Sequence, residues 1–343
     1  MFKLFFLFTS LLSVFASENA LRGATMTTLL DEHDEWKQFS NFQERFARKY
    51  ETLEELENRF QVFRTNLRNI VIHNLDHNQN FTMGVNQFTD LTPEEFKAQY
   101  VTGIKGKVES SGCGSFSSSA SGAPSSIDWR NKGAVTSVKD QGQCGSCWTF
   151  SATGAIEGAW AISKGQLIDL SEEQLVECAG LKYGSMGCNG GQMDGAFKYV
   201  MEHGQCALSS YPYTSGTGES GSCKTSCSSV AHLSTCSDVK PNDQISLKGA
   251  VAQQPVSIAI EADTKYFQSY SSGVLTSTSC GTNLDHGVLI VGYGEENGIK
   301  YWLVKNSWST TWGDKGYVKI ARSDSTNDAG ICGIGMQPSF PSV

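Results

Sequence analysis

Apolar side chains in the otherwise polar N-terminal region recur at the spacing of a helix. They lie three or four residues apart, at Trp36, Phe39, Phe42 and Phe46, and side chains at this spacing share one helix face. A longer stripe follows at the same spacing and mixes charged, amide and apolar side chains: Glu55, Arg59, Phe63, Asn66, Ile70 and Asn74. That stripe predicts a second, long helix. This stripe is too polar for a helix face that only packs into a hydrophobic core.

The pattern changes in the rest of the chain. Helix signals mark three segments: one that starts at Cys147, one opened by the capping box Ser171-x-x-Gln174, and one from Met193 to His203 that Gly204 closes. Strand signals come later, as an alternation at Val256, Ile258 and Ile260 and as apolar runs that end at Val291, Val304 and Ile320. Helices followed by strands predict an α+β fold.

Two further segments divide the chain. Residues 101–122 are rich in Ser and Gly, which predicts a cleavable linker without a core. At the N-terminus, Lys3 precedes an apolar run from Leu4 to Phe15 that ends at the small residue Ala16, which predicts a secretory signal peptide over residues 1–16. A membrane span needs about 20 apolar residues. We therefore expect a secretory-pathway protein with no membrane span.

Charge and cysteine content narrow the function. The net charge of −8 argues against a nucleic-acid partner, because nucleic-acid-binding proteins concentrate Lys and Arg. Eleven cysteines in a secreted chain predict disulfide bonds. An odd number leaves at least one thiol unpaired, and a catalytic thiol is the natural candidate.

The candidate nucleophile is Cys147, in the run Gln141-Gly142-Gln143-Cys144-Gly145-Ser146-Cys147-Trp148. Far downstream, His286 follows Asp285 at the start of an apolar run, and Asn306 ends a strand-like run and precedes Ser307 and Trp308. A cysteine, a histidine and an asparagine that are distant in sequence are the pattern of a nucleophile, its base and the group that orients the base.

Other interpretations exist for these residues. Cys147 could form a disulfide with Cys144, but no thioredoxin-like pattern surrounds the pair. A zinc site of Cys144, Cys147, Cys223 and Cys227 has the wrong spacing. His286 could be an ordinary core histidine. We expect no metal and no cofactor.

With these motifs, the chain from about Asp31 resembles the papain family of cysteine endopeptidases, in its cathepsin L-like branch. The mixed stripe matches the family's ERFNIN propeptide pattern, and Gly84-x-Asn86-x-Phe88-x-Asp90 resembles its second propeptide motif. The resemblance implies a papain-like α+β fold: a helical lobe, a β-barrel-like lobe, the active-site cleft between them, and a mainly helical propeptide in front. It also implies a signal peptide at 1–16, a propeptide at 17–122 with its inhibitor domain at about 31–96, and a mature enzyme at 123–343.

The resemblance implies an endopeptidase that works by a thiolate–imidazolium pair and a thioester acyl-enzyme. The catalytic residues are then Cys147, His286, Asn306 and, at the oxyanion, Gln141. A depressed pKa for the cysteine and a raised pKa for the histidine are expected of such a pair. The enzyme is expected as a zymogen whose propeptide leaves on acidification, as contacts that include Asp90 and Glu55 weaken. We expect the enzyme to accept substrates with Leu, Phe or Val two residues before the cleaved bond. Arg should be accepted there less readily, because neutral Gln337 cannot pair a guanidinium charge.

The remaining implications concern binding and disulfides. The substrate-binding positions are Gly190, Gly191, Met193, Ala259, Leu284, Asp285, Gln337 and Trp308. The family's bridges map to Cys144 with Cys188, Cys178 with Cys223, and Cys280 with Cys332. We further expect Cys206 to pair with Cys227, and Cys236 to stay free. Expected partners are protein and peptide substrates, the chain's own propeptide as an intramolecular inhibitor, and cystatin-type inhibitors, for a monomer in an extracellular, lysosomal or vacuolar setting. The alternatives are a non-catalytic binding relative and a propeptide that acts as an inhibitor by itself.

Overall fold

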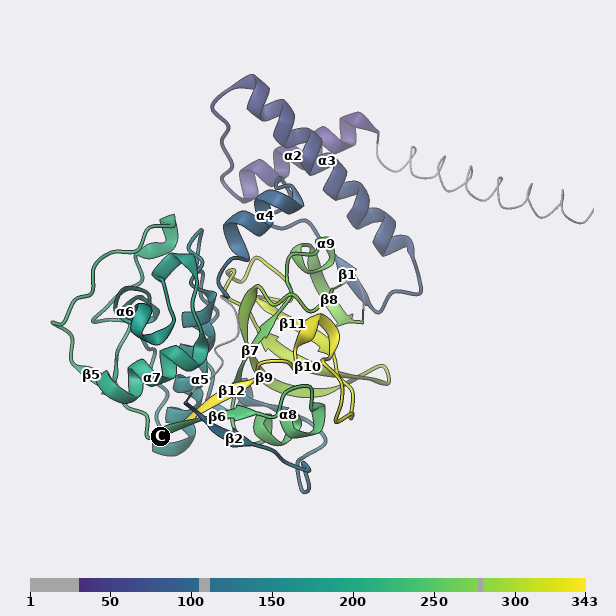
Figure 1. Ribbon diagram of the computed structural model, residues 1–343. Helices are drawn as coiled ribbons and strands as arrows, with labels where there is room; N and C mark the ends of the chain where they lie inside the picture. The colour runs from purple at the N-terminus through teal and green to yellow at the C-terminus, as the bar shows by residue number, and fades with distance from the viewer. Residues whose placement is uncertain (1–30, 105–111, 277–279) are drawn as a thin grey trace, which may run out of the picture. The chain divides into compact units, whose positions relative to one another are not determined.

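The computed structural model describes residues 31–104, 112–276 and 280–343 (Figure 1). It divides into two compact units, residues 1–68 and 69–343. The predicted signal peptide, with Lys3 and Ala16, lies outside the described residues. Within the described part of the chain, no helix is both long enough and apolar enough to cross a membrane.

The first unit is built from α2 (Glu32–Arg45) and the first part of α3 (Leu53–Leu75). Asp31 caps α2 by accepting a hydrogen bond from the Asp34 N–H at 2.8 Å. The core of the unit is a group of buried aromatic rings: Phe39, Phe42, Phe60 and Phe63. Beside them Glu35 is fully buried and pairs with Arg64 and Arg68 at 2.7 and 2.6 Å. The helix predicted from the mixed stripe is confirmed, because all six of its residues lie on α3.

The second unit begins with the rest of α3, followed by β1 (Phe81–Met83) and α4 (Pro93–Tyr100). Asn74, near the end of α3, holds β1 in place: its side chain donates to the Met83 carbonyl at 2.8 Å and accepts from the Met83 N–H at 2.9 Å. A capping box formed by Thr92 and Glu95 starts α4.

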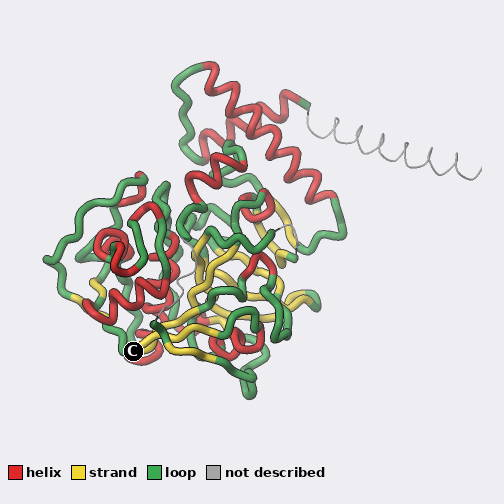
Figure 2. Tube along the Cα trace, viewed as in Figure 1, coloured by secondary structure: helices red, strands yellow, loops and turns green. Residues whose placement is uncertain are grey.

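Helices gather on one side of the second unit and strands on the other (Figure 2). The helical side contains α5 (Cys147–Lys164), α6 (Glu172–Cys178) and α7 (Met193–His203), so the three predicted helices are confirmed. It also holds the strand pair β4 (Gln205–Cys206) and β5 (Ser229–Ala231) and the short 3₁₀ helices η2 (Leu181–Tyr183), η3 (Gly187–Asn189) and η4 (Ser215–Thr217). Trp148, Ala152 and Ile156 of α5 are fully buried, so this helix is the core of its lobe.

A ten-stranded sheet makes up the other side, in the order β1-β8-β11-β10-β9-β7-β12-β6-β2, with β3 paired to β9. Its further strands are β2 (Gly114–Phe116), β3 (Ile127–Asp128), β6 (Thr235–Val239), β7 (Val256–Ile260), β8 (Tyr270–Leu275), β9 (His286–Glu296), β10 (Ile299–Lys305), β11 (Tyr317–Ala321) and β12 (Ser339–Ser342). Helices α8 (Gln244–Val251) and α9 (Lys265–Gln268) and 3₁₀ helices η1 (Trp129–Lys132) and η5 (Ile331–Gly333) connect them. Ser151 joins the two sides, because its hydroxyl donates from α5 to the Val288 carbonyl of β9 at 2.7 Å.

Five disulfide bonds involve every cysteine except Cys147. Four are the expected pairs: Cys144–Cys188, Cys178–Cys223, Cys206–Cys227 and Cys280–Cys332. The expectation that Cys236 stays free is wrong, because it bonds to Cys113. The segment predicted to be a linker, residues 101–122, contains a short strand, because Gly114–Phe116 form β2 and pair with β6.

Candidate active site

Cys147 is the first residue of α5 and is fully buried. Its sulfur accepts a hydrogen bond from the backbone N–H of Gly287 at 3.1 Å. The N-terminal end of a helix carries a partial positive charge, which favours a thiolate. Helix α5 and the Gly287 N–H therefore offer two separate features that could stabilise negative charge on this sulfur.

His286 and Asn306 come together because β9 and β10 are antiparallel neighbours. His286 begins β9 and is fully buried, and Asn306 directly follows β10. The His286 Nε2 lies 2.8 Å from the Asn306 Oδ1. An amide oxygen only accepts hydrogen bonds, so Nε2 carries the hydrogen and Nδ1 is the basic nitrogen. The next residue in the chain, Gly287, donates its backbone N–H to the Cys147 sulfur, so the nucleophile contacts the residue that directly follows the histidine.

Trp308 covers the histidine from one side. Its ring stacks on His286 with centroids 4.4 Å apart and an interplanar angle of 23°. Trp308 is itself fully buried, so it shields the hydrogen bond between His286 and Asn306 from water. A hydrogen bond in such a place holds its geometry more firmly than one exposed to solvent.

Gln141 is held in one orientation by two neighbours. Its Oε1 accepts from the Ser307 hydroxyl at 2.7 Å, and its Nε2 donates to the Cys144 carbonyl at 2.9 Å. A primary amide has two N–H groups, so one is left to face a substrate oxygen. Ser307 was missed in the sequence, although its place directly after Asn306 was a usable signal.

A short segment after α4 covers the sulfur. We call Gly103 and Ile104 the covering segment: the Gly103 carbonyl accepts from the Gly191 N–H at 3.0 Å, and the Ile104 N–H donates to the Asp285 carbonyl at 3.3 Å. A Cβ at Gly103 would lie 2.2 Å from the Cys147 sulfur, so only glycine permits this approach. No motif in the sequence indicated these two residues.

The pKa values of the covered site are opposite to those expected of the active pair. Burial raises the pKa of the Cys147 thiol to about 12, against the smaller effect of the Gly287 N–H. Burial also lowers the pKa of His286 to about 4, against the effect of Asn306. Both groups are therefore uncharged at neutral pH, because the covering segment and the protein around them exclude the water that would solvate an ion pair.

Several of the expected substrate-binding residues lie near the covering segment. Gly191 pairs with Ile104 in a parallel bridge, and Gly190 directly precedes it. Met193 and Ala259 are buried in the same hydrophobic cluster as Ile104, and Leu284 packs against that cluster. Gln337 is half-buried in the segment after η5. Met336 was missed: a Cβ at Gly333 would lie 2.8 Å from Leu284 and 3.0 Å from the Met336 sulfur, so these two side chains converge there.

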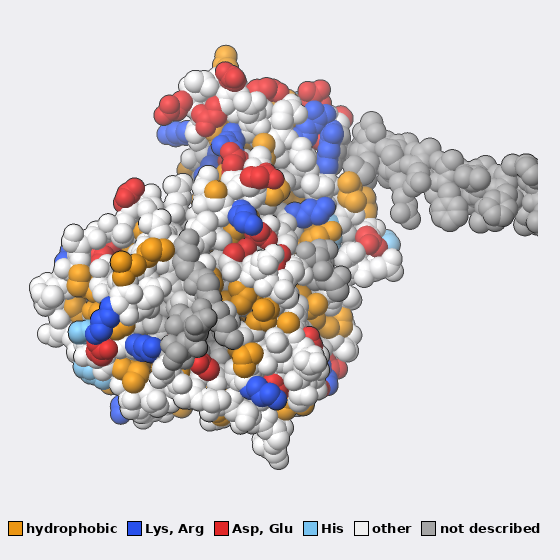
Figure 3. Space-filling model, viewed as in Figure 1, with side chains coloured by type: hydrophobic (Ala, Val, Ile, Leu, Met, Phe, Trp, Pro, Cys, Tyr) orange, Lys and Arg blue, Asp and Glu red, His pale blue; other side chains and the backbone are white. Residues whose placement is uncertain are grey.

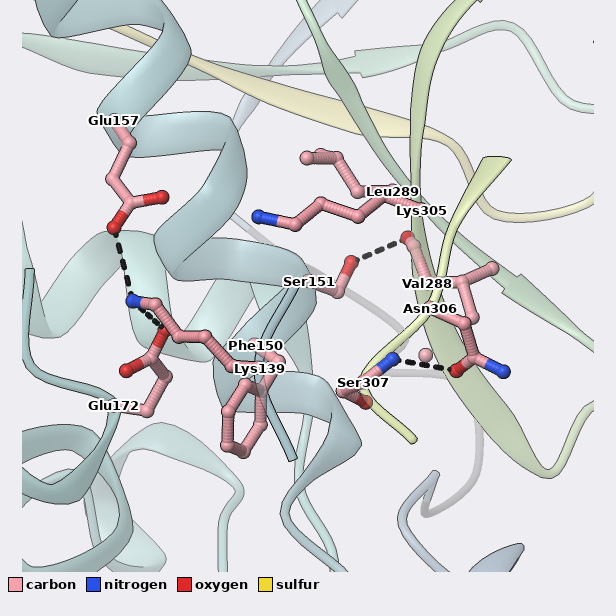
Figure 4. A pocket seen from close by; sticks show the side chains of 11 residues that line it. Lys139, Phe150, Ser151, Glu157, Glu172, Val288, Leu289, Lys305, Asn306 and Ser307 are labelled. Atoms are coloured by element: carbon pink, nitrogen blue, oxygen red, sulfur yellow. Dashed lines mark hydrogen bonds and ion pairs between the residues drawn. The ribbon is translucent and has the colours of Figure 1, made fainter. Parts of the chain in front are cut away.

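A cavity of about 20 Å³ lies behind Asn306 and Ser307 and has charged walls (Figure 4). Lys139 pairs there with Glu172 at 2.6 Å and with Glu157 at 3.2 Å. Lys305, which precedes Asn306, donates to the Thr136 hydroxyl at 3.0 Å. Burial raises the pKa of Glu172 to about 7 and lowers that of Lys305. This network was not foreseen, because its members are scattered along the sequence.

Charged side chains on the face shown in Figure 3 are of both signs and interspersed. Among the described residues on that face, Lys and Arg do not gather into a stripe.

Comparisons with known proteins agree with this geometry. A family model described as papain family cysteine protease matches residues 123–342, and one described as cathepsin propeptide inhibitor domain (I29) matches residues 39–96. The senescence-specific cysteine protease SAG12 of Arabidopsis thaliana is 41% identical over 353 residues, which covers 98% of each protein. SAG39 of Oryza sativa subsp. japonica is 43% identical over 305 residues, which covers 87% of each.

Solved structures are similar over most of the chain. Digestive procathepsin L2 from the Tenebrio molitor larval midgut has a TM-score of 0.82 and 39% identity, and covers 90% of this chain and 100% of that one. The recombinant stem bromelain precursor has a TM-score of 0.80 and 38% identity, over 90% and 99% of the two chains. The predicted papain-like α+β fold with a helical propeptide is thereby confirmed. The chain belongs to the papain family of cysteine proteases.

Proposed function

We propose that this papain-like cysteine endopeptidase, made as a proenzyme with an inhibitory propeptide, works through a Cys147–His286 pair that becomes charged once the propeptide has left. The observation that carries the proposal is the pair of contacts around the histidine. Asn306 fixes Nε2, and the neighbouring Gly287 N–H contacts the Cys147 sulfur. Three segments that are distant in sequence thus supply a nucleophile, a base and its orienting group.

The reaction then follows from these residues. The Cys147 thiolate attacks the substrate carbonyl carbon, and the carbonyl oxygen gains the negative charge. The free N–H of Gln141 and the backbone N–H of Cys147 stabilise that charge. The C–N bond breaks as His286 gives its Nδ1 proton to the departing amine, which leaves a thioester on Cys147. His286 next takes a proton from water, the hydroxide attacks the thioester, and the acid product leaves with the thiolate restored.

The environment of the pair supports activation by uncovering. Removing the covering segment would let water reach the pair, which lowers the pKa of Cys147 and raises that of His286 relative to the covered state. We propose acid-triggered removal of residues 17–122 and a mature enzyme over 123–343. We also propose a pocket of Met193, Ala259, Leu284 and Gln337 that prefers Leu, Phe or Val over Arg.

The disulfide bonds indicate the cellular location only as far as the secretory pathway. The disulfide-rich proprotein belongs to the secretory pathway, because such bonds form in oxidising compartments. We further propose that the final location of the protein is extracellular, lysosomal or vacuolar. Immunolocalisation of the matured chain with a vacuolar or lysosomal marker tests it.

The decisive test is selective alkylation of Cys147 with iodoacetamide at pH 5, before and after activation, with peptide hydrolysis measured in parallel. We expect slow labelling of the proenzyme, fast labelling of the mature form, and loss of hydrolysis in proportion to the label. Asn306→Ala should slow hydrolysis while Cys147 still reacts. A mature form that hydrolyses peptides with Cys147 fully alkylated would overturn the proposal.

A further inference from the structure

Residues 113–120, which we call the tether segment, lie against the catalytic part of the second unit. Strand β2 within it pairs in parallel with β6: Gly114 is opposite Ser237, and Phe116 is opposite Val239. The Lys240 N–H extends this pairing by donating to the Phe116 carbonyl at 2.8 Å. The tether segment therefore forms the edge strand of the enzyme's own sheet.

Side chains continue the attachment beyond β2. The Phe116 ring packs edge-on against Phe340 with centroids 5.1 Å apart. The Ser246 hydroxyl accepts from the Ser118 N–H at 3.1 Å and donates to the Ser118 carbonyl at 3.2 Å. These contacts bind the tether segment to β12 and α8 along most of its length.

A covalent bond completes the attachment. Cys113 is bonded to Cys236, which lies 123 residues further along the chain. The bond crosses the expected start of the mature enzyme at Ala123, whereas both cysteines of each other bridge lie after that point. Ser121 and Gly122, between the tether segment and Ala123, are exposed in a turn, which is where proteases cut most readily.

We propose that a cut at this turn does not free the propeptide, because the Cys113–Cys236 bond keeps every residue before the cut attached to the enzyme. The covering segment then returns to Cys147 by an intramolecular step, at an effective concentration on the order of millimolar. Release requires a second event. Either the chain is cut between Ile104 and Cys113, or a dithiol reductant gives two electrons and two protons to the bond, which yields two thiols and oxidises the dithiol to a disulfide.

The tether is testable without any activity of the enzyme. In a Cys147→Ala proenzyme, Ser121 and Gly122 are replaced by the recognition sequence of an unrelated, sequence-specific protease. This protease cuts the chain there, and the products are run on denaturing gels with and without dithiothreitol. We expect one band of full mass without reductant and two bands with it. Two bands in the absence of reductant would overturn the proposal, whatever the fate of the proposed function.

Two variants of this inactive chain sharpen the comparison. Cys113→Ser with Cys236→Ser should give two bands under both conditions. Cys206→Ser with Cys227→Ser is the matched control, since that bridge lies wholly after Ala123, and it should behave like the parent. If the first double variant does not fold, the comparison of the cut parent chain with and without reductant still tests the tether.

The inhibitory consequence rests on the proposed function and has its own measurement. The same cut is made in chains that keep Cys147, and hydrolysis at pH 7 is followed over a 1,000-fold dilution. An untethered propeptide dissociates on dilution, so specific activity should rise at least about tenfold in the Cys113→Ser, Cys236→Ser chain and stay flat in the parent. An equal rise in both chains would refute control by the tether.

Discussion

Gln141 and Ser307 show how a single hydroxyl can set the direction of an amide for which we propose a catalytic role. The Ser307 hydroxyl holds Oε1 of Gln141, and the Cys144 carbonyl takes one of its two N–H groups. Without the hydroxyl, the amide could rotate and present its oxygen to the developing negative charge. We therefore expect Ser307 to be a positioning residue that acts through Gln141.

We expect Gln141→Ala to lower kcat about 10²- to 10³-fold, the usual effect of losing one donor to an oxyanion. Ser307→Ala should lower kcat about tenfold or more with KM little changed, because only the transition state carries the full charge. Steady-state kinetics on the activated enzyme measure both effects.

The double variant separates positioning from a structural role. If Ser307 acts through Gln141, removing both side chains should cost little more than removing Gln141 alone. The rate of Cys147 alkylation should stay near that of the parent in all three variants. Additive losses, or a parallel loss of alkylation, would mean that Ser307 supports the site in some other way.

At the scale of elements, helices and strands with local patterns could be predicted, whereas features that depend on distant partners could not. Helix α6 starts at its own capping residue Ser171, helices α5 and α7 end at Gly165 and Gly204, and the sequence of β7 alternates over its length. Strand β2 is only Gly114–Phe116 and has no such alternation; it is a strand because β6 offers an edge more than a hundred residues later.

The same distinction applies to the site. Cys147, His286, Asn306 and Gln141 could be named from motifs. The approach of Gly103 to the sulfur could not, because it depends on where α5 and Gly191 lie in space. The charged network behind Asn306 was missed for the same reason, since its lysines and glutamates come from separate elements.

Some buried carboxyl groups have raised pKa values, so they keep their protons to a higher pH than usual. Burial raises the pKa of Asp285, beside β9, to about 7, and that of Asp194, on α7, to about 6. Their ordinary value is 3.8, so between about pH 4 and pH 7 these two groups bind more protons in the native chain than in the unfolded chain. Their contribution to the free energy of unfolding therefore falls as the pH rises through this window. His286, whose pKa is lowered to about 4, contributes in the opposite direction, and we expect the two carboxyl groups together to outweigh it.

We expect the Cys147→Ala proenzyme to have a higher Tm at pH 5.5 than at pH 7.5, as measured by differential scanning fluorimetry. Asp285→Asn should reduce the difference, because the amide keeps an oxygen for the Ala262 N–H that Asp285 Oδ1 now accepts from at 2.7 Å but no longer titrates. A Tm that rises towards pH 7.5 in the parent, or an unchanged difference in the variant, would contradict this assignment.

At the scale of the whole molecule, the proposed latency should depend on Gly103. We expect Gly103→Ala to move the covering segment off the sulfur, because the added Cβ would lie 2.2 Å from it. Labelling of Cys147 by iodoacetamide in the intact proenzyme at pH 7 should then be at least about tenfold faster. Mass spectrometry of the labelled chain over time gives the rate.

Gly114→Ala is the matched control. Its added Cβ would lie 3.6 Å from the Cys236 carbonyl oxygen, an ordinary contact. This variant should therefore label as slowly as the parent. Equal labelling rates for Gly103→Ala and Gly114→Ala would show that something other than the covering segment protects the thiol.

The neutral state of the covered pair has a consequence for proton exchange with the solvent. Under the propeptide the proton is on the Cys147 sulfur and His286 is uncharged; in the proposed active pair the proton has moved to the histidine and the sulfur is an anion. The number of protons bound by the two residues is the same in both states, so uncovering them takes up and releases none. By linkage, the catalytic pair cannot make propeptide release depend on pH near neutrality. Sensitivity to acid must come from groups outside this pair, at contacts that hold the propeptide elsewhere; one contact of α4 is the ion pair of Lys97 with Asp263, before α9, at 2.5 Å.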